Sequence, residues 1–245
     1  MSERFFSDKP ISGERLTLDG PEAHHLLHVM RAAKGQRVTL FDDTGGEFEA
    51  VIEKLWRSSV ELRIVARHAI DRELPFALTV GVSLPKGERQ KWLVEKLTEL
   101  GATTLVPLST ERSVAQPTAA ALERLSRTVI EAAKQCGRNR LMKIAKPQAW
   151  REWVSQEPPA GELRSPDRRL IAHPGGKTLS QLNLVESSHT RLAIGPEGGL
   201  TDEEIASAIA AGWEQVDLGP RILRVETAAV ALSAAVVLSA RGAVE

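Results

Sequence analysis

The stretch LGPRILRVETAAVAL, residues 218–232, joins two elements that both belong in the interior of a fold. The preceding WEQVDL is typical of a short strand, and the following AAVALSAAVVL is apolar on every face of a helix. Between them stand Arg221, Arg224 and Glu226. An unpaired charge removed from water is costly. These three side chains are therefore paired, solvated at a cleft, or held for a ligand.

Length and composition describe an ordinary globular protein. The chain has 245 residues, enough for one large domain or two modest ones, with 42% hydrophobic and 26% charged residues. The single cysteine, Cys136, excludes an intrachain disulfide, and no Cys/His cluster has zinc-ligand spacing, so we expect no metal. The N-terminus lacks an apolar leader, and the longest apolar run is too short to span a membrane. We therefore expect a cytoplasmic protein with no membrane partner.

Charge is unevenly distributed along a chain whose formal net charge is zero. Residues 71–150 carry 13 Lys and Arg against 8 Asp and Glu, and GRNRLMKIAK, residues 137–146, contains no acid. Two interpretations stand: this segment contacts an anionic partner, or it is a solvated loop that follows a helix.

The first seventy residues have the pattern of a small β module. Residues 47–53 and 58–66 alternate apolar and polar side chains, as half-buried strands do. The turn DDTGG, residues 42–46, joins the first of these to RVTLF and predicts a hairpin. One short helix is expected to begin near Pro21.

From residue 73 onward strands alternate with helices. We expect strands at 76–84 and 103–108, with helices at 87–101 and 119–135, and three more strands after a proline-rich connector. This alternation predicts an α/β layer with a mainly parallel sheet. The predicted domains are residues 1–72 and 73–245.

Three successive strands of the second domain run into segments rich in glycine and proline. These segments are HPGGK at 173–177, GPEGG at 195–199 and LGPRILR at 218–224. Ligands bind beyond the carboxyl ends of parallel strands, and glycine lets a ligand approach the backbone closely. Because neither a G-x-G-x-x-G nor a P-loop motif is present, NAD and ATP are disfavoured.

Single residues in these segments keep alternative interpretations. Each glycine also fits an ordinary turn, and His173 fits either a catalytic base or a loop residue. Glu197 either contacts a ligand or serves the N-terminus of the helix that begins near Thr201. The run TDEE is a capping signature, with Glu204 three residues after Thr201.

The stretches IGPEGGLTDEE and LGPRILRVETAA, with EKLTELGATTLVPLSTERS, EAAKQCGRNR and HHLLHVMRAAKGQRVTLFD, resemble the SPOUT class of RNA methyltransferases. Specifically, they resemble the 16S rRNA (uracil-N3)-methyltransferase family, over nearly the whole chain and in the same order. The resemblance implies an α/β fold whose mainly parallel sheet carries a SPOUT-type trefoil knot. It also implies an N-terminal PUA-like β-barrel domain that binds RNA.

The same resemblance implies an activity, a cofactor and partners. The activity is S-adenosylmethionine-dependent methylation of N3 of a specific uridine, of the uridine 1498 type, in 16S rRNA of the small ribosomal subunit. The family works as a homodimer. The apolar helix after residue 224 then lies at a subunit interface, although its sequence fits a buried core helix equally well.

Site residues follow from the resemblance by position. Arg224 is the expected catalytic cation for the uracil anion, and Glu226 either orients it, accepts the proton, or only pairs Arg224 beside the helix N-terminus. The implied cofactor contacts are His173, Pro174, Gly195, Pro196, Glu197, Gly198, Leu218, Gly219, Ile222, Leu223 and Arg224. The candidate RNA contacts, each of which also fits a solvated surface charge, are Arg4, Arg31, Arg138 and Arg140.

Two rival functions remain open. The chain could be a non-catalytic RNA-binding or ribosome-assembly protein, or an enzyme that uses another nucleotide. A concave glycine-lined pocket argues against a pure binding module, which has no need of one.

Overall fold

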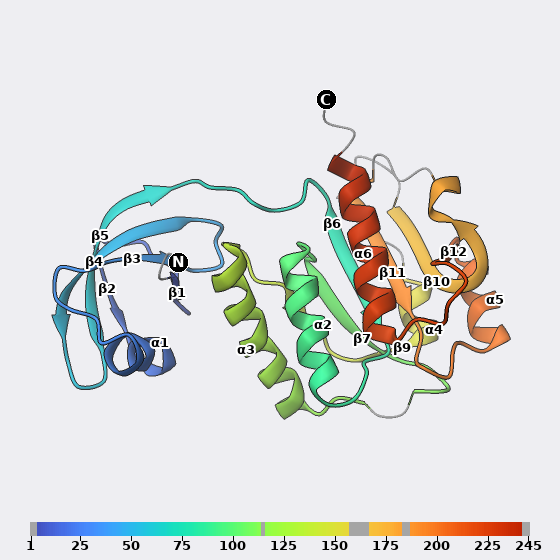
Figure 1. Ribbon diagram of the computed structural model, residues 1–245, viewed down its shortest axis with the longest axis horizontal. Helices are drawn as coiled ribbons and strands as arrows, with labels where there is room; N and C mark the ends of the chain where they lie inside the picture. The colour runs from blue at the N-terminus through green and yellow to red at the C-terminus, as the bar shows by residue number, and fades with distance from the viewer. Residues whose placement is uncertain (1–3, 114–115, 157–166, 183–186, 242–245) are drawn as a thin grey trace. The chain divides into compact units, whose positions relative to one another are not determined.

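The computed structural model describes residues 4–113, 116–156, 167–182 and 187–241 (Figure 1). Contacts divide the chain into unit 1, Met1–Glu73 with Ala133–Leu141, and unit 2, Leu74–Ala132 with Met142–Glu245. Residues 133–141 thus belong with the N-terminal unit, which a division of the sequence at residue 72 does not anticipate. No helix among the described residues is both long and apolar enough to cross a membrane.

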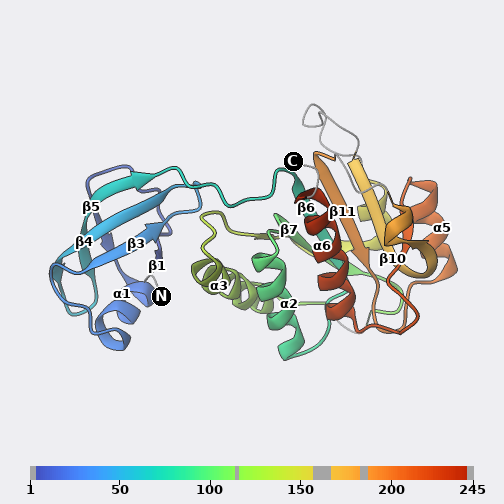
Figure 2. The ribbon, with the colours of Figure 1, turned by 45° about the horizontal axis from the view of Figure 1, so that its top comes forward.

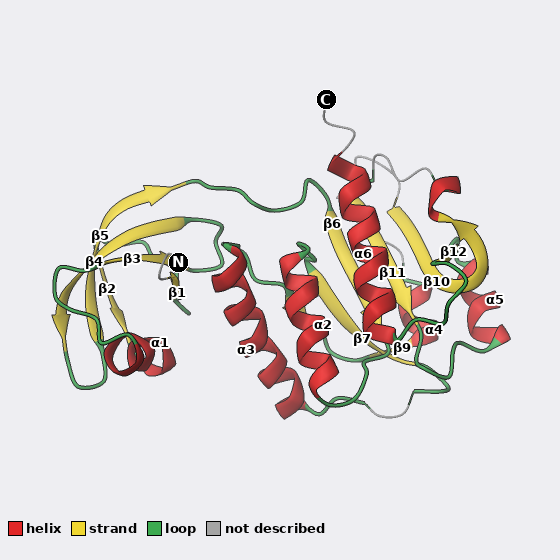
Figure 3. Ribbon diagram, viewed as in Figure 1, coloured by secondary structure: helices red, strands yellow, loops and turns green. Residues whose placement is uncertain are grey.

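Unit 1 contains a five-stranded sheet in the order β1-β3-β4-β5-β2 (Figure 3). β1 is parallel to β3, and the other neighbours are antiparallel. The predicted hairpin and the alternation are confirmed, since β3 pairs β4 and Phe48, Ala50 and Ile52 are buried. The bounds are β1 Arg4–Phe6, β2 Arg15–Leu18, α1 Gly20–His24, a π-helix His25–Val29, β3 Arg37–Phe41, β4 Glu47–Leu55 and β5 Val60–His68.

Arg4 fastens residues 137–139 to the β module of unit 1. Its Nη2 donates to Asn139 Oδ1 at 2.7 Å and to the carbonyls of Arg138 and Gly137 at 3.2 and 3.3 Å. Its Nη1 pairs with Glu47, which Arg72 Nη1 also contacts at 3.0 Å. Burial acts to raise the pKa of Glu47, but the hydrogen bonds and positive charges of Arg4 and Arg72 together outweigh it and lower that pKa.

Unit 2 is built on a parallel sheet in the order β12-β10-β11-β6-β7-β8, with β9 also paired to β7. Every pair in it is parallel, which confirms the predicted sheet type. The strands are β6 Ala77–Val82, β7 Thr104–Ser109, β8 Lys143–Ile144, β9 Gln148–Ala149, β10 Asp167–Thr178, β11 His189–Ile194 and β12 Glu214–Asp217.

Helices cover both faces of this sheet. Figures 1 and 2 show α2 and α6 side by side on one face and α4 and α5 on the other. The predicted capping box is confirmed, because Thr201 accepts from the Glu204 N–H and Glu204 accepts from the Thr201 N–H. The bounds are α2 Glu88–Glu99, α3 Ala119–Cys136, α4 Trp150–Val154, a 3-10 turn Leu179–Gln181, α5 Asp202–Ala210 and α6 Val225–Arg241.

α2 buries Leu93, Val94 and Leu97 and leaves Trp92 43% exposed. One local expectation for unit 2 was wrong. Residues 173–177 are not a loop beyond a strand, because β10 bulges between Ala172 and Lys177 and then pairs with β12 again.

A packed cation and two tryptophans form the core beneath the α4 and α5 face. Arg191 is 4% exposed, and its guanidinium lies 4.7 Å from the ring centre of Trp153 and 5.3 Å from that of Trp213. Its Nη2 also donates to the Trp153 carbonyl at 2.6 Å. Aromatic faces and carbonyl oxygens thus replace the water that this cation gives up. On the central strand β6, Gly81 leaves the space that the Trp153 ring occupies, since a Cβ there would lie 2.5 Å from it.

We expect Gly81→Ala to lower the free energy of unfolding by about 1–3 kcal/mol, because the buried Trp153 ring has no room to retreat. Urea denaturation followed by tryptophan fluorescence measures this loss. Gly13→Ala is the matched control, since a Cβ at Gly13 makes only ordinary contacts of 3.7 Å. Equal stability of the two variants would contradict the packing described here.

The lowered pKa of Glu47 predicts a pH-dependent contribution to the stability of unit 1. A carboxyl group whose pKa is depressed by folding stabilises the fold above its unfolded-state value and loses that contribution as pH falls through the folded-state value. The stability difference between wild type and Glu47→Gln should therefore be constant above about pH 6 and shrink below the ordinary value of 4.5. Urea unfolding over a pH series checks this. A stability difference between the two proteins that grows as the pH falls would contradict the lowered pKa of Glu47.

Candidate functional site

A cavity of about 300 Å³ lies at the carboxyl ends of β11 and β12, next to the bulge of β10. The three glycine-rich segments chosen from the sequence all contribute to its wall. Of the implied cofactor contacts, the structure places in this wall His173, Pro174, Gly195, Pro196, Glu197, Leu218, Gly219, Ile222 and Leu223. Gly198 and Arg224 are not among the lining residues.

The wall also contains residues that sequence reasoning missed. Most are apolar side chains that continue the buried faces of strands and of α6, so nothing in the sequence separates them from core. Asp217 is charged and stands at the end of β12. The missed residues are Ala172, Ile194, Leu200, Asp217, Val225 and Ala228, whereas Gly199 and Arg221 belong to segments that the sequence analysis had already selected.

Two glycines shape the wall by close approach and by backbone conformation. A Cβ on Gly195 would lie 2.8 Å from Leu200 Cγ, so only glycine fits between that side chain and the cavity. Gly219 has φ +105°, and its N–H donates to Asp217 Oδ1 at 2.8 Å. His173 is half-buried, with its Nδ1 3.4 Å from Gln215 Nε2.

Glu226 is a buried carboxylate at the beginning of α6. Its side chain is 8% exposed, and Oε2 has no hydrogen-bond partner among the described residues. The cation that faces it is Arg89 at the start of α2, whose Nη1 lies 3.8 Å from Oε2. The same Nη1 lies 3.4 Å from Glu197 Oε1. Sequence reasoning missed Arg89, because no motif separates it from other charged residues at a helix start.

Arg224 stands directly before α6, where its carbonyl accepts the first helical hydrogen bond from Ala228. Its side chain is exposed and forms no ion pair with a described residue. The interpretation in which Glu226 only pairs Arg224 is therefore not what the structure shows, since the partner of Glu226 is Arg89.

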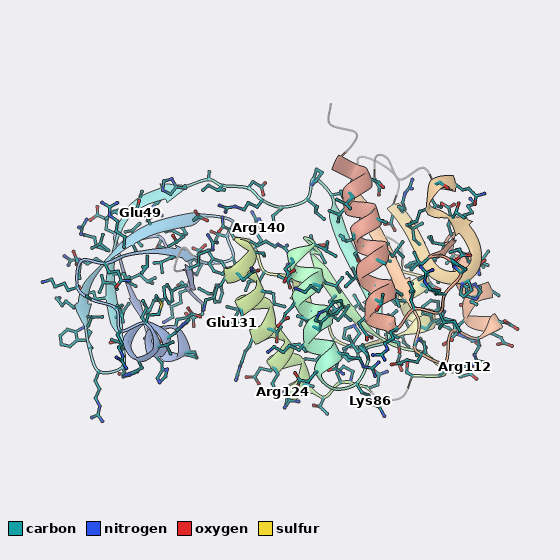
Figure 4. The ribbon with its side chains drawn as sticks, in the orientation of Figure 1. Glu49, Lys86, Arg112, Arg124, Glu131 and Arg140 are labelled. Atoms are coloured by element: carbon teal, nitrogen blue, oxygen red, sulfur yellow. The ribbon has the colours of Figure 1, made fainter. Side chains whose placement is uncertain are left out.

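Basic side chains from neighbouring loops lie at the same edge of the sheet. Arg112, from the loop after β7, donates from Nη1 to the carbonyl of Gly198 at 2.9 Å. Lys86, from the loop between β6 and α2, is exposed, and Figure 4 shows both residues at this end of unit 2. The loop at 195–199 is thus held by Arg112 on its backbone and by Arg89 on the carboxylate of Glu197.

The four candidate RNA contacts of unit 1 fall into two groups. Arg4 and Arg138 have side chains only 8% and 5% exposed, because they pair with Glu47 and Glu73 inside the unit. The guanidinium groups of Arg4 and Arg138 are thus engaged in buried ion pairs within unit 1, whereas those of Arg31 and Arg140 are exposed.

Arg140 lines a second cavity, of about 330 Å³, which lies within unit 1. Its guanidinium lies across Gly45, where a Cβ would be 2.9 Å from Nη2, and no acid among the described residues pairs with it. This guanidinium is thus available to an anion from outside. In neither unit do His, Cys, Asp and Glu of the described residues gather in a group of three that could hold a metal.

Family models match both units. Residues 72–237 match a family described as RNA methyltransferase domain, and residues 18–65 match one described as RNA methyltransferase PUA domain. A curated relative from Synechocystis, ribosomal RNA small subunit methyltransferase E, is 36% identical over 220 residues. That alignment covers 87% of this chain and 69% of the relative.

Two solved structures superpose over almost the whole chain. A putative methyltransferase from Legionella pneumophila, in complex with the bound cofactor SAM, is 30% identical with a TM-score of 0.89 and covers 98% of each chain. A ribosomal RNA small subunit methyltransferase E from Neisseria gonorrhoeae, bound to S-adenosyl methionine, is 31% identical with a TM-score of 0.87 and covers 96% of each chain.

Proposed function

The chain belongs to the ribosomal RNA small subunit methyltransferase E family, and from this premise we propose that it methylates N3 of a specific uridine in 16S rRNA. S-adenosylmethionine is the proposed methyl donor, and the uridine is of the uridine 1498 type. The fold expectation is confirmed at the level of an α/β RNA methyltransferase domain with a parallel sheet that follows a PUA domain. We further propose that residues 73–245 carry the trefoil knot.

The observation that carries this function is the fit between the cavity at the strand ends and S-adenosylmethionine. Its volume of about 300 Å³ falls in the range of small-ligand sites, and Gly195 and Gly219 place backbone without a side chain in its wall. The ligand bears a sulfonium cation, an amine and a carboxylate. Glu197 and Asp217 supply acids to the cavity wall, and Arg221 supplies a cation for the carboxylate.

Apolar side chains and backbone groups complete the proposed cofactor site. We propose that His173, Pro174, Pro196, Leu218, Gly219, Ile222 and Leu223 contact the cofactor from the wall, with Gly198 and Arg224 at its margin. Ile222 is 99% exposed, so its side chain is free to cover a ligand that enters.

When bound, S-adenosylmethionine supplies a methyl group made electrophilic by the positive sulfur. Uracil N3 carries a proton and becomes nucleophilic only when that proton leaves, which spreads negative charge to O2 and O4. We propose that Glu226 Oε2, an acceptor without a donor among the described residues, receives the proton from N3. Arg224, whose guanidinium has no acidic partner in the described part of the chain, then stabilises the charge on the uracil oxygens.

We propose that RNA binds to unit 1, which includes the basic residues at 137–141. Residues 1–72 form the PUA-like RNA-binding domain, and Arg31 and Arg140 contact phosphates. Arg4 and Arg138 support this surface from inside, because Arg4 holds residues 137–139 in place beside Arg140. We propose that the protein acts in the cytoplasm, with the small ribosomal subunit as its partner.

A homodimer completes the proposal. α6 exposes Leu238 at 66% and α2 exposes Trp92 at 43%, and these apolar side chains lie on neighbouring helices of one face of the sheet. A second copy of the chain that covers this face accounts for their exposure.

Calorimetric titration with S-adenosylmethionine tests the function first, with binding of one ligand per chain expected. Methylation of 16S rRNA is then followed by mass spectrometry of nucleosides. Arg224→Ala should lower turnover by about 100-fold or more while unfolding temperature and dimer are kept. A protein that binds no S-adenosylmethionine would favour the non-catalytic RNA-binding alternative, and a fully active folded Arg224→Ala would remove Arg224 from the chemistry.

Salt dependence tests the RNA surface. Joint substitution of Arg31 and Arg140 with Ala should weaken RNA binding and lower the slope of log K against log salt by roughly one for each phosphate that is no longer neutralised. Arg127→Ala is the matched control, because Arg127 is an exposed arginine of α3 that pairs with Glu123. Arg4→Ala should instead lower the free energy of unfolding. An unchanged slope in the Arg31 and Arg140 variant would place the RNA elsewhere.

A further inference from the structure

Two carboxylates from separate elements share one cation beside the cavity. Glu197 belongs to the loop that lines the cavity, Glu226 to the first turn of α6, and Arg89 to the first turn of α2. Nη1 of Arg89 lies 3.4 Å from Glu197 Oε1 and 3.8 Å from Glu226 Oε2. A single guanidinium nitrogen therefore connects the cofactor loop to the acid that begins α6.

The two carboxylates that face Arg89 differ in burial. The Glu197 side chain is 43% exposed, so water screens its attraction to Arg89 and the ion pair contributes little to stability. The Glu226 side chain is 8% exposed, and its Oε2 has no hydrogen-bond donor among the described residues. Removal of the facing cation would leave a buried charge uncompensated, which is costly. Glu226 thus depends on Arg89 far more than Glu197 does.

We propose that Arg89 is a positioning residue of the methyltransferase site, which holds the Glu226 carboxylate for proton transfer and ties it to the cofactor loop through Glu197. This inference rests on the proposed function. Because both carboxylates are held by one guanidinium, a bound cofactor that orders the loop at 195–199 also favours the arrangement in which Arg89 faces Glu226.

A variant of Arg112 distinguishes the effect of Arg89 on the loop at 195–199 from its effect on Glu226. It holds the same loop through the Gly198 carbonyl at 2.9 Å, and within the described part of the chain it forms no ion pair with Glu226. Loss of Arg112 therefore frees the loop alone, whereas loss of Arg89 frees the loop and Glu226 together. Lys96 provides the control position on α2, because its ion pair is with Glu99 at the exposed surface.

The experiment measures the Kd of S-adenosylmethionine by calorimetry and both kcat and KM on 16S rRNA. Arg112→Ala should weaken cofactor binding by about threefold with a kcat loss of similar size or less. Arg89→Ala should weaken cofactor binding by about the same factor but lower kcat by about thirtyfold. Lys96→Ala should leave both within about twofold. Arg89→Lys, which keeps the charge, should recover part of the kcat.

A double-mutant cycle decides whether Arg89 acts through Glu226. Glu226→Gln and the double variant Arg89→Ala with Glu226→Gln should have kcat values within about threefold of each other, because the second change has nothing left to position. Losses in kcat that multiply would overturn the inference. So would an Arg89→Ala protein whose kcat falls no further than that of Arg112→Ala.

Binding supplies a readout that does not depend on turnover. Arg89→Ala together with Glu197→Gln should bind S-adenosylmethionine no more weakly than Glu197→Gln alone, since both changes remove the same ion pair. Thermal unfolding of each variant identifies any that fails to fold. A wild-type protein that binds no S-adenosylmethionine overturns the proposed function and this inference together, whereas normal wild-type activity with a multiplicative cycle overturns the inference only.

Discussion

The parallel alignment of β10, β11 and β12 is the constraint on which the site depends. In a parallel sheet every strand delivers its carboxyl end to the same edge, so three segments far apart in the sequence meet without contacts of their own. The bulge of β10 between Ala172 and Lys177 keeps that strand paired to β12 while it passes the cavity. Backbone pairing thus fixes the floor of the site, and Val225 and Ala228 of α6 complete its wall.

Local patterns in the sequence predict the elements well, and the glycine and proline content at three strand ends selects the segments that form the cavity. The capping box at Thr201 and Glu204 and the hairpin depend on neighbours along the chain. The partner of Glu226 does not: Arg89 lies in a segment with no motif and reaches Glu226 only through the packing of α2 on α6. No local sequence pattern predicts that Arg89 and Glu226 lie next to each other.

The same limit explains the arginines of unit 1. Arg4, Arg138 and Arg140 are alike as sequence, yet Arg4 and Arg138 are buried against Glu47 and Glu73 while Arg140 faces out. The difference arises because residues 133–141 fold with the N-terminal unit, which brings Arg138 but not Arg140 against an acid of that unit. Which basic residue is free for RNA is therefore decided by long-range contacts and not by composition.

Glu226 shows why a charge stands at the beginning of an otherwise apolar helix. Helix N-termini favour acids, but that preference is satisfied by an exposed carboxylate and does not require a buried one. Burial with an unsatisfied Oε2 costs free energy, and a fold selected for stability alone would place an uncharged side chain there. The cost is offset only in part by Arg89 at 3.8 Å. Glu226 Oε2 is buried, has no hydrogen-bond donor among the described residues and lies next to Val225 of the cavity wall. These are properties that a group needs if it is to accept the weakly acidic proton of uracil N3.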